Sequence, residues 1–255
     1  MFEQLTSGNF LTSILIFFFI LIFAELLALY LSVAGFTLVE VILLVSFPLL
    51  AYFSALPVVS STITGLAGGI YVTVLATSRV FDVPIIHLGD NVIGVNVVGF
   101  FVPTIITVKM LVQRRVPWKQ FCLLVVIIAA VTYLYTFFYP ALGVVIYLFA
   151  IPPILAAAIA FMLRRMKGSS EFNPALLAYA GATIGVLVGA DLLNLYRLAD
   201  HDWGKPVLVS VGGGGVLDAI FLAGMVALFA DLVFRGREEN ILGSLVRIFR
   251  GGGQR

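Results

Sequence analysis

The chain has 255 residues, of which 62% are hydrophobic and only 11% are charged. Globular domains average about 25% charged residues, so the composition excludes an ordinary soluble enzyme and a disordered tail. The net charge of +2 gives no indication of a nucleic-acid partner. The single cysteine, Cys122, excludes an intramolecular disulfide and a cysteine-rich metal site. We expect an integral membrane protein whose partner is the lipid bilayer, with no cofactor and no metal.

Long apolar runs predict where the chain crosses the membrane. About 20 apolar residues span the hydrocarbon core as a helix. The runs predict an all-α polytopic membrane protein, residues 1–255 forming one membrane domain of about seven spans. The predicted spans are residues 10–34, 36–56, 92–112, 118–139, 142–163, 174–198 and 216–234. Pro152-Pro153 is expected to interrupt the fifth span. The N-terminus has Glu3 and no Lys or Arg before Arg79, so we read it as a retained span and not as a signal peptide.

Two segments fall outside this helical pattern. Residues 57–91 are too polar for a span at first and then β-rich, with alternation over 70–75 and a second run over 80–86. They predict a small outer β-like or re-entrant segment; the alternative is an eighth helix, which would move the N-terminus to the inside. Apolar residues at helical spacing over 240–250 predict an interfacial helix, with a frayed polar tail as the alternative.

The basic residues predict the orientation. Lys and Arg gather between spans three and four, between spans five and six, and after span seven. Cytoplasmic loops are enriched in these residues. We therefore predict a cell-membrane protein with a cytoplasmic C-terminus and an outer N-terminus.

Asp191 and Asp218 are the main candidates for function. Carboxylates inside a span are costly unless they are paired or hydrated, so each one indicates a functional site. Asp191 lies in GADLLNL of span six, and Asp218 follows a run of four glycines in span seven. Each is expected roughly 10 Å below the outer end of its helix. Because a short loop joins the two spans, the aspartates are expected to lie at matching depth on antiparallel neighbours.

Two facing carboxylates have a specific chemistry. Both cannot ionise easily when they lie a few ångströms apart, so the pair holds one proton. One carboxylate can then activate water while the other donates to a carbonyl oxygen, as in aspartic proteases. The same pair could bind a cation or pass a proton. A purely structural alternative is that each aspartate accepts hydrogen bonds from free N–H groups at a helix end.

Several polar or small residues are candidates to line the same site. Asn194 follows Asp191 by three residues, and the four glycines let an extended substrate approach closely. Tight packing of the turn explains the glycines at least as well. The segment that opens span three is a third wall or a capped helix start. The predicted substrate-binding residues are Asn194, Gly212, Gly213, Gly214, Gly215, Asp90 and Asn96.

Other residues of interest have simpler interpretations. Gly181, Gly185 and Gly189 repeat every four residues, which is typical of close helix packing. Glu40, near the inner end of span two, is expected to reach water. A zinc site using His87 and His201 is only weakly indicated.

The chain resembles a prokaryotic family of integral membrane proteins, domain of unknown function 1614. The resemblance rests on GADLLNL at 189–195 and on the glycine-rich motif at 210–224, and extends more weakly to 95–111. It implies a multi-span membrane protein without an assigned activity.

A fainter likeness is to intramembrane aspartyl proteases of the presenilin and signal-peptide-peptidase type. That likeness implies catalytic roles for Asp191 and Asp218. The sequence departs from that pattern at Ala190, where a Tyr is expected, and at 215–218, where Gly-Val-Leu-Asp replaces a contiguous Gly-x-Gly-Asp. The leading hypothesis is an intramembrane protease that cleaves a transmembrane peptide. The alternatives are a proton- or cation-coupled transporter or channel and a non-catalytic scaffold.

Overall fold

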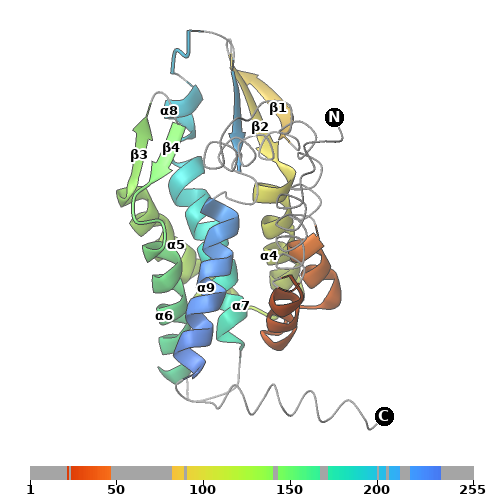
Figure 1. The fold of residues 1–255 in the computed structure, drawn as a ribbon. Helices are drawn as coiled ribbons and strands as arrows, with labels where there is room; N and C mark the ends of the chain where they lie inside the picture. The colour runs from red at the N-terminus through yellow and green to blue at the C-terminus, as the bar shows by residue number, and fades with distance from the viewer. Residues whose placement is uncertain are drawn as a thin grey trace, which may run out of the picture.

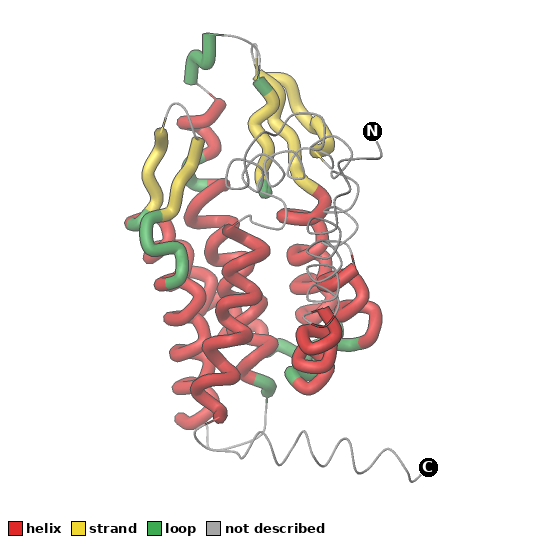
Figure 2. Tube along the Cα trace, in the orientation of Figure 1, coloured by secondary structure: helices red, strands yellow, loops and turns green. Residues whose placement is uncertain are grey.

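A computed structural model describes residues 22, 24–46, 82–88, 91–139, 143–166, 172–199, 201–204, 207–212 and 219–236. Within these residues the chain is mostly helical, and its strands gather at one end of a helical bundle (Figures 1 and 2). The predictions for residues 57–81 and 240–250 lie outside the described residues, as do Asp90, Gly213–Gly215 and Asp218.

The bundle is built from upright helices that run alternately up and down (Figure 1). Two of them include a π-helical turn, labelled η1 and η2. The elements are η1 (Val97–Phe101) leading into α4 (Val102–Val112), α5 (Trp118–Leu134), α6 (Ile151–Met166), α7 (Pro174–Val186) leading into η2 (Leu187–Leu192) and α8 (Leu195–Ala199), and α9 (Ala219–Gly236). An N-terminal hairpin of helices Ala24–Val33 and 38–46 packs on the bundle near its lower end in Figure 1.

Two small sheets lie at the opposite end from this hairpin. The first has the order β1-β2-β5, with β1 antiparallel to β2 and β2 parallel to β5. The second is the hairpin β3–β4, which connects α5 to α6. The strands are β1 (Asp82–Leu88), β2 (Asn91–Asn96), β3 (Thr136–Tyr139), β4 (Gly143–Ile146) and β5 (Leu208–Val211). The β-rich run expected near 80–86 is therefore a strand.

Three of the predicted spans begin or end as strands and not as helices. The sequence predicted residues 92–96, 136–139 and 143–146 to be helical, and the structure corrects this. The segments consist largely of β-branched and aromatic residues, which favour strands. Hydrophobicity alone cannot distinguish a buried strand from a helix end. The expected mid-span break at Pro152-Pro153 is also wrong, because both prolines lie in the first turn of α6, where a missing N–H is tolerated.

Helix α7 is the centre of the bundle. It packs against α4, α5, α6 and α9, and all but one of its residues are buried. Gly181 and Gly185 in α7 and Gly189 in η2 face α5. A Cβ atom at Gly181 would lie 2.4 Å from Leu124, and one at Gly185 would lie 2.6 Å from Ile128. The prediction that this stripe serves close helix packing is confirmed.

The outward faces of the surrounding helices are apolar. Their exposed large hydrophobic residues include Ile105, Val108 and Val112 on α4, Leu123, Val126 and Leu134 on α5, Ile151, Ile154, Met162 and Met166 on α6, and Phe229 and Val233 on α9. Among the described residues, the helix Pro174–Arg197 is the one long and apolar enough to cross a membrane, and 72% of its apolar window is buried in the bundle. The seven spans stay a prediction.

Alanine substitutions at Gly181 in α7 and Gly189 in η2 should reveal how tightly α5 packs against this continuous helix. At Gly189, a Cβ would lie 2.4 Å from the carbonyl oxygen of Ala129, a backbone atom that cannot move alone. We expect Gly189→Ala to destabilise the fold by about 1–3 kcal/mol, the range typical of overpacking. Gly181→Ala should cost less, because the Leu124 side chain can rotate away and alanine gains about 1 kcal/mol in helix propensity. Thermal unfolding in detergent measures both, and equal losses would contradict this account.

Candidate functional site

Asp191 lies in η2, where the helix that continues α7 widens into a π-helix. Its side chain is half-buried. The N–H of Leu193 donates to the carbonyl of Val188, five residues earlier, at 3.0 Å. π-helical turns inside α-helices are often found at functional sites. Asp191 was predicted on a regular membrane-spanning helix, and the structure has it in an irregular π-helical turn.

Asn194 supports this turn from the residues that follow it in the chain. Its amide nitrogen donates to the carbonyls of Gly189 at 3.3 Å and Ala190 at 2.9 Å, and its side chain is buried. Its oxygen accepts from Arg197 at 3.3 Å. The amide thus satisfies carbonyl groups beside Asp191, so the structure gives Asn194 a positioning role in η2.

The helix before Asp191, α7, and the helix after Asp218 in sequence, α9, are antiparallel neighbours. α7 and α9 pack closely, and a Cβ at Gly224 would lie 2.6 Å from the Tyr179 ring and 2.7 Å from the Thr183 hydroxyl. Gly224 is therefore level with the turn between those two residues. Ala219, five residues earlier, then lies about 7 Å nearer the sheet end than Gly224. Asp191 lies about 7 Å nearer the sheet end than Ala219. Asp218, the chain neighbour of Ala219, is outside the described residues.

A polar cluster joins the three strands where the first sheet meets the bundle. The Asp82 carboxylate accepts hydrogen bonds from Asn96 at 2.8 Å and from Ser210 at 2.7 Å. Each residue comes from a different strand, β1, β2 and β5. Sequence reasoning missed Asp82 and Ser210, because the strand pairing that places Asp82 opposite Asn96 cannot be read from spacing. No sequence motif connects residues 82 and 210.

Asn96 also begins the helix that follows it. Its side-chain oxygen accepts from the N–H groups of Val98 at 2.9 Å and Gly99 at 3.0 Å. The sequence predicted a cap at Asp90 or Asn91 for a helix starting at residue 92, but Asn91 lies in β2 and the cap is at Asn96, where η1 begins at residue 97.

Gly212 has a packing role at the end of β5. Its φ of +73° is in the left-handed region, and a Cβ there would lie 2.7 Å from the backbone nitrogen of Phe100 in η1. Only glycine fits this close contact without strain. For the first of the four glycines, the packing explanation therefore holds.

The two histidines have different surroundings. His87 is exposed on β1. His201 packs against the rings of Phe138 and Trp203, with centroids 5.0 and 4.6 Å away, and its carbonyl accepts from Asn91. Within the described ranges, no three His, Cys, Asp or Glu side chains form a metal-binding group.

Glu40 corrects a sequence expectation. Its side chain does not reach water; it is fully buried at the end of the bundle opposite the sheets. Arg115 donates to both of its oxygens, at 2.6 and 2.8 Å, and the ammonium of Lys109 lies 3.2 Å away. Glu40 also accepts from the N–H of Thr37 at 2.8 Å, which is one of the two hydrogen bonds of a capping box at the start of helix 38–46.

Further polar contacts tie the hairpin turn to the same place. Arg115 donates to the carbonyl of Gly35, and Asn173 at the start of α7 donates to the carbonyl of Ala34 at 2.7 Å. The two helices of the N-terminal hairpin are thus fastened to α4, to the loop after it and to α7. Sequence reasoning missed the contact between Glu40 and Arg115, because the two residues are 75 positions apart and only the fold brings them together.

The structure defines a mostly helical protein with two small sheets at one end of the bundle and, among the described residues, one helix long and apolar enough to cross a membrane. The family described as "Protein of unknown function (DUF1614)" matches residues 49–230, more than half of the chain. The chain therefore belongs to this family, as the resemblance implied. No curated protein and no solved structure matches it. The hairpin residues 24–46 precede the matched region.

Removal of the Glu40 charge should weaken the attachment of the N-terminal hairpin to the bundle. We call the contacts of Glu40 with Arg115 and Lys109 the clamp. Breaking a buried ion pair costs about 3–5 kcal/mol, because the partner cation loses its counter-charge. Arg115 and Lys109 remain partly accessible to water, so we expect Glu40→Gln to destabilise by about 3 kcal/mol, the low end of that range. The matched control is Glu25→Gln, on the exposed side of the same hairpin, which should leave the melting temperature unchanged. Equal effects of both variants would contradict the clamp.

Proposed function

We propose that the chain is a multi-pass membrane protein. The support is the apolar character of both sides of its helices. In a water-soluble bundle, the outward face of α5 would be polar. Here the exposed positions of that helix between its ends are Leu123, Val126, Ala130, Tyr133 and Leu134. Exposed apolar faces on adjacent helices fit a lipid environment.

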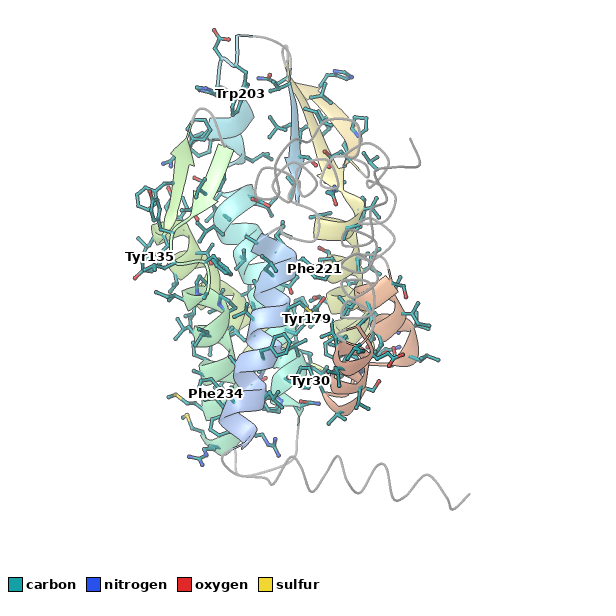
Figure 3. The ribbon with its side chains drawn as sticks, in the orientation of Figure 1. Tyr30, Tyr135, Tyr179, Trp203, Phe221 and Phe234 are labelled. Atoms are coloured by element: carbon teal, nitrogen blue, oxygen red, sulfur yellow. The ribbon has the colours of Figure 1, made fainter. Side chains whose placement is uncertain are left out.

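The ends of the bundle carry different residues. The described charges of α4, α5 and α6 lie in the turns at one end, at Lys109, Lys119, Arg164 and Arg165. The opposite end carries exposed aromatic residues, among them Tyr147 and Tyr196. Figure 3 has Trp203 at that end and Phe234 at the basic end. The 17 residues of α5 span about 25 Å, close to the thickness of the hydrocarbon core.

This arrangement supports the basic end as cytoplasmic. The C-terminal end of α9 is at the basic end in Figure 1, which supports a cytoplasmic C-terminus. The sheets and the loop 201–204 would then be outside.

We further propose that Asp191 and Asp218 form a paired-carboxylate site of the intramembrane aspartyl protease type. The observation that carries this proposal is the close antiparallel packing of α7 and α9, which brings Ala219 to within about 7 Å of the level of Asp191. One carboxylate would remove a proton from water, and the water oxygen would attack the peptide carbonyl carbon. The other would protonate the carbonyl oxygen; the C–N bond then breaks as the proton passes to the amine.

The first sheet offers a way to hold an extended substrate. Among the described strands, β5 pairs with β2 on one side only, so its second edge has no strand partner there. An extended peptide can add to such an edge through main-chain hydrogen bonds. β5 leads directly into the glycine run before Asp218, which would bring a peptide on this edge towards the carboxylates.

The second candidate function is the movement of a proton or cation through the same site. The specific observation that favours it is the π-helical break at Asp191, within the helix Pro174–Arg197. Broken membrane helices provide ion and proton sites in transporters.

Topology is tested by cysteine labelling in intact cells. With Cys122 replaced by alanine, a cysteine at Asp202 should react with an impermeant maleimide added outside. A cysteine at Arg114 should react only after the cells are permeabilised, because both positions are exposed but lie at opposite ends of the bundle. Labelling of position 114 in intact cells would contradict the orientation.

Function is tested with purified protein and a single-span reporter peptide. We expect cleavage products by mass spectrometry with the wild type and none with Asp191→Asn or Asp218→Asn. Asp202→Asn, in the exposed outer loop, is the control and should cleave normally. If the wild type cleaves no reporter but moves protons into liposomes, and both Asn variants lose that movement, the second candidate replaces the first.

Stability of the same variants separates a functional pair from structural caps. Facing carboxylates repel, so each single Asn variant should be neutral or more stable, and the double variant should be non-additive. Aspartates that only accept backbone N–H groups would each cost about 1–3 kcal/mol when replaced, with additive effects. The second pattern would contradict the paired site.

A further inference from the structure

Among the residues that the structure describes, the basic end of the bundle carries exposed cations and no exposed carboxylate beside them. Arg114 and Lys119 are exposed, and Arg164 is partly exposed at the end of α6. Within the described residues, the carboxylates nearest this end, Glu40 and Asp231, are buried. Glu40 is also already bound by Arg115 and Lys109. The described solvent-exposed surface of this end is therefore cationic.

Apolar side chains lie immediately beside these cations. Trp118 is 64% exposed at the start of α5, between Arg114 and Lys119 in sequence, and Met166 is 82% exposed at the end of α6. α5 and α6 are packed neighbours joined through the β3–β4 hairpin, so the start of one and the end of the other share the same end of the bundle. Apolar and cationic groups thus meet along one rim.

We propose that this rim binds anionic phospholipid, with the headgroup phosphate at Arg114, Lys119 and Arg164 and the acyl chains along Trp118 and Met166. The proposal rests on the membrane placement proposed above. It commits to a lipid because the cations are continuous with the apolar outer face of α5 and α6, which a free phosphate would not contact. A zwitterionic lipid would match the apolar part but not the charge.

The test compares short-chain lipids on the full chain in non-ionic detergent. Dioctanoyl phosphatidylglycerol should raise the melting temperature in a concentration-dependent way, and dioctanoyl phosphatidylcholine should not. The effect should shrink at high salt, because exposed charges are screened. Each Lys or Arg near an anionic surface contributes about 1 kcal/mol, so Arg114→Gln with Lys119→Gln should weaken phosphatidylglycerol binding about thirtyfold.

The matched control keeps both charges: Arg114→Lys with Lys119→Arg should bind phosphatidylglycerol nearly as the wild type does. The proposal is overturned if both lipids stabilise equally, if the Gln variant responds like the wild type, or if inorganic phosphate at the same concentration reproduces the effect. Equal stabilisation by both lipids would leave the membrane placement standing. A chain that stays soluble when the detergent is removed, with neither lipid acting, would overturn the membrane placement itself.

Discussion

Close contact between α7 and the helices around it is the constraint on which the rest of the structure depends. A helix buried on all sides cannot use a polar face to set its orientation. Its rotation is fixed by the positions at which glycine lets a neighbouring helix approach. Gly181 and Gly185 of α7 let α5 approach, and Gly224 of α9 lets α9 approach Tyr179 and Thr183 of α7. Small residues replace the hydrophobic effect as the source of specificity when the outer solvent is itself apolar. The depth of Asp191 relative to α9 follows from this contact.

The charged clamp at the basic end complements this apolar packing. Glu40 has two cations on it, Arg115 and Lys109, and it fixes a hairpin that precedes the family-matched residues to the loop after α4. A buried carboxylate is tolerated there because Arg115, Lys109 and the N–H of Thr37 satisfy its oxygens together. The attachment is therefore specific to one register of the hairpin, whereas apolar contacts alone would allow it to slide.

The sequence predicted the helical bundle, the packing stripe and the adjacency of α7 and α9, because these depend on composition and on short-range spacing. It failed where pairing over long distances decides the outcome. The segment 91–96 is apolar enough for a span, yet it becomes a central strand because β1 and β5 pair with it. The Asp82 cluster and the Glu40 clamp were missed for the same reason, since each joins residues that no local pattern relates.

The two π-helical turns, η1 and η2, lie where the apolar helix bundle meets the end that carries the sheets. η1 begins directly after β2, and η2 ends directly before the outer turn at Asn194. At each, a buried asparagine satisfies backbone groups that have no partner within the helix: Asn96 accepts from two N–H groups at the start of η1, and Asn194 donates to two carbonyls of η2. A π-turn needs such support, because its backbone groups would otherwise be buried without partners. Since Asp191 lies in one of these supported turns, its position depends on polar contacts at the sheet end as well as on the close packing of α7 and η2 against their neighbours.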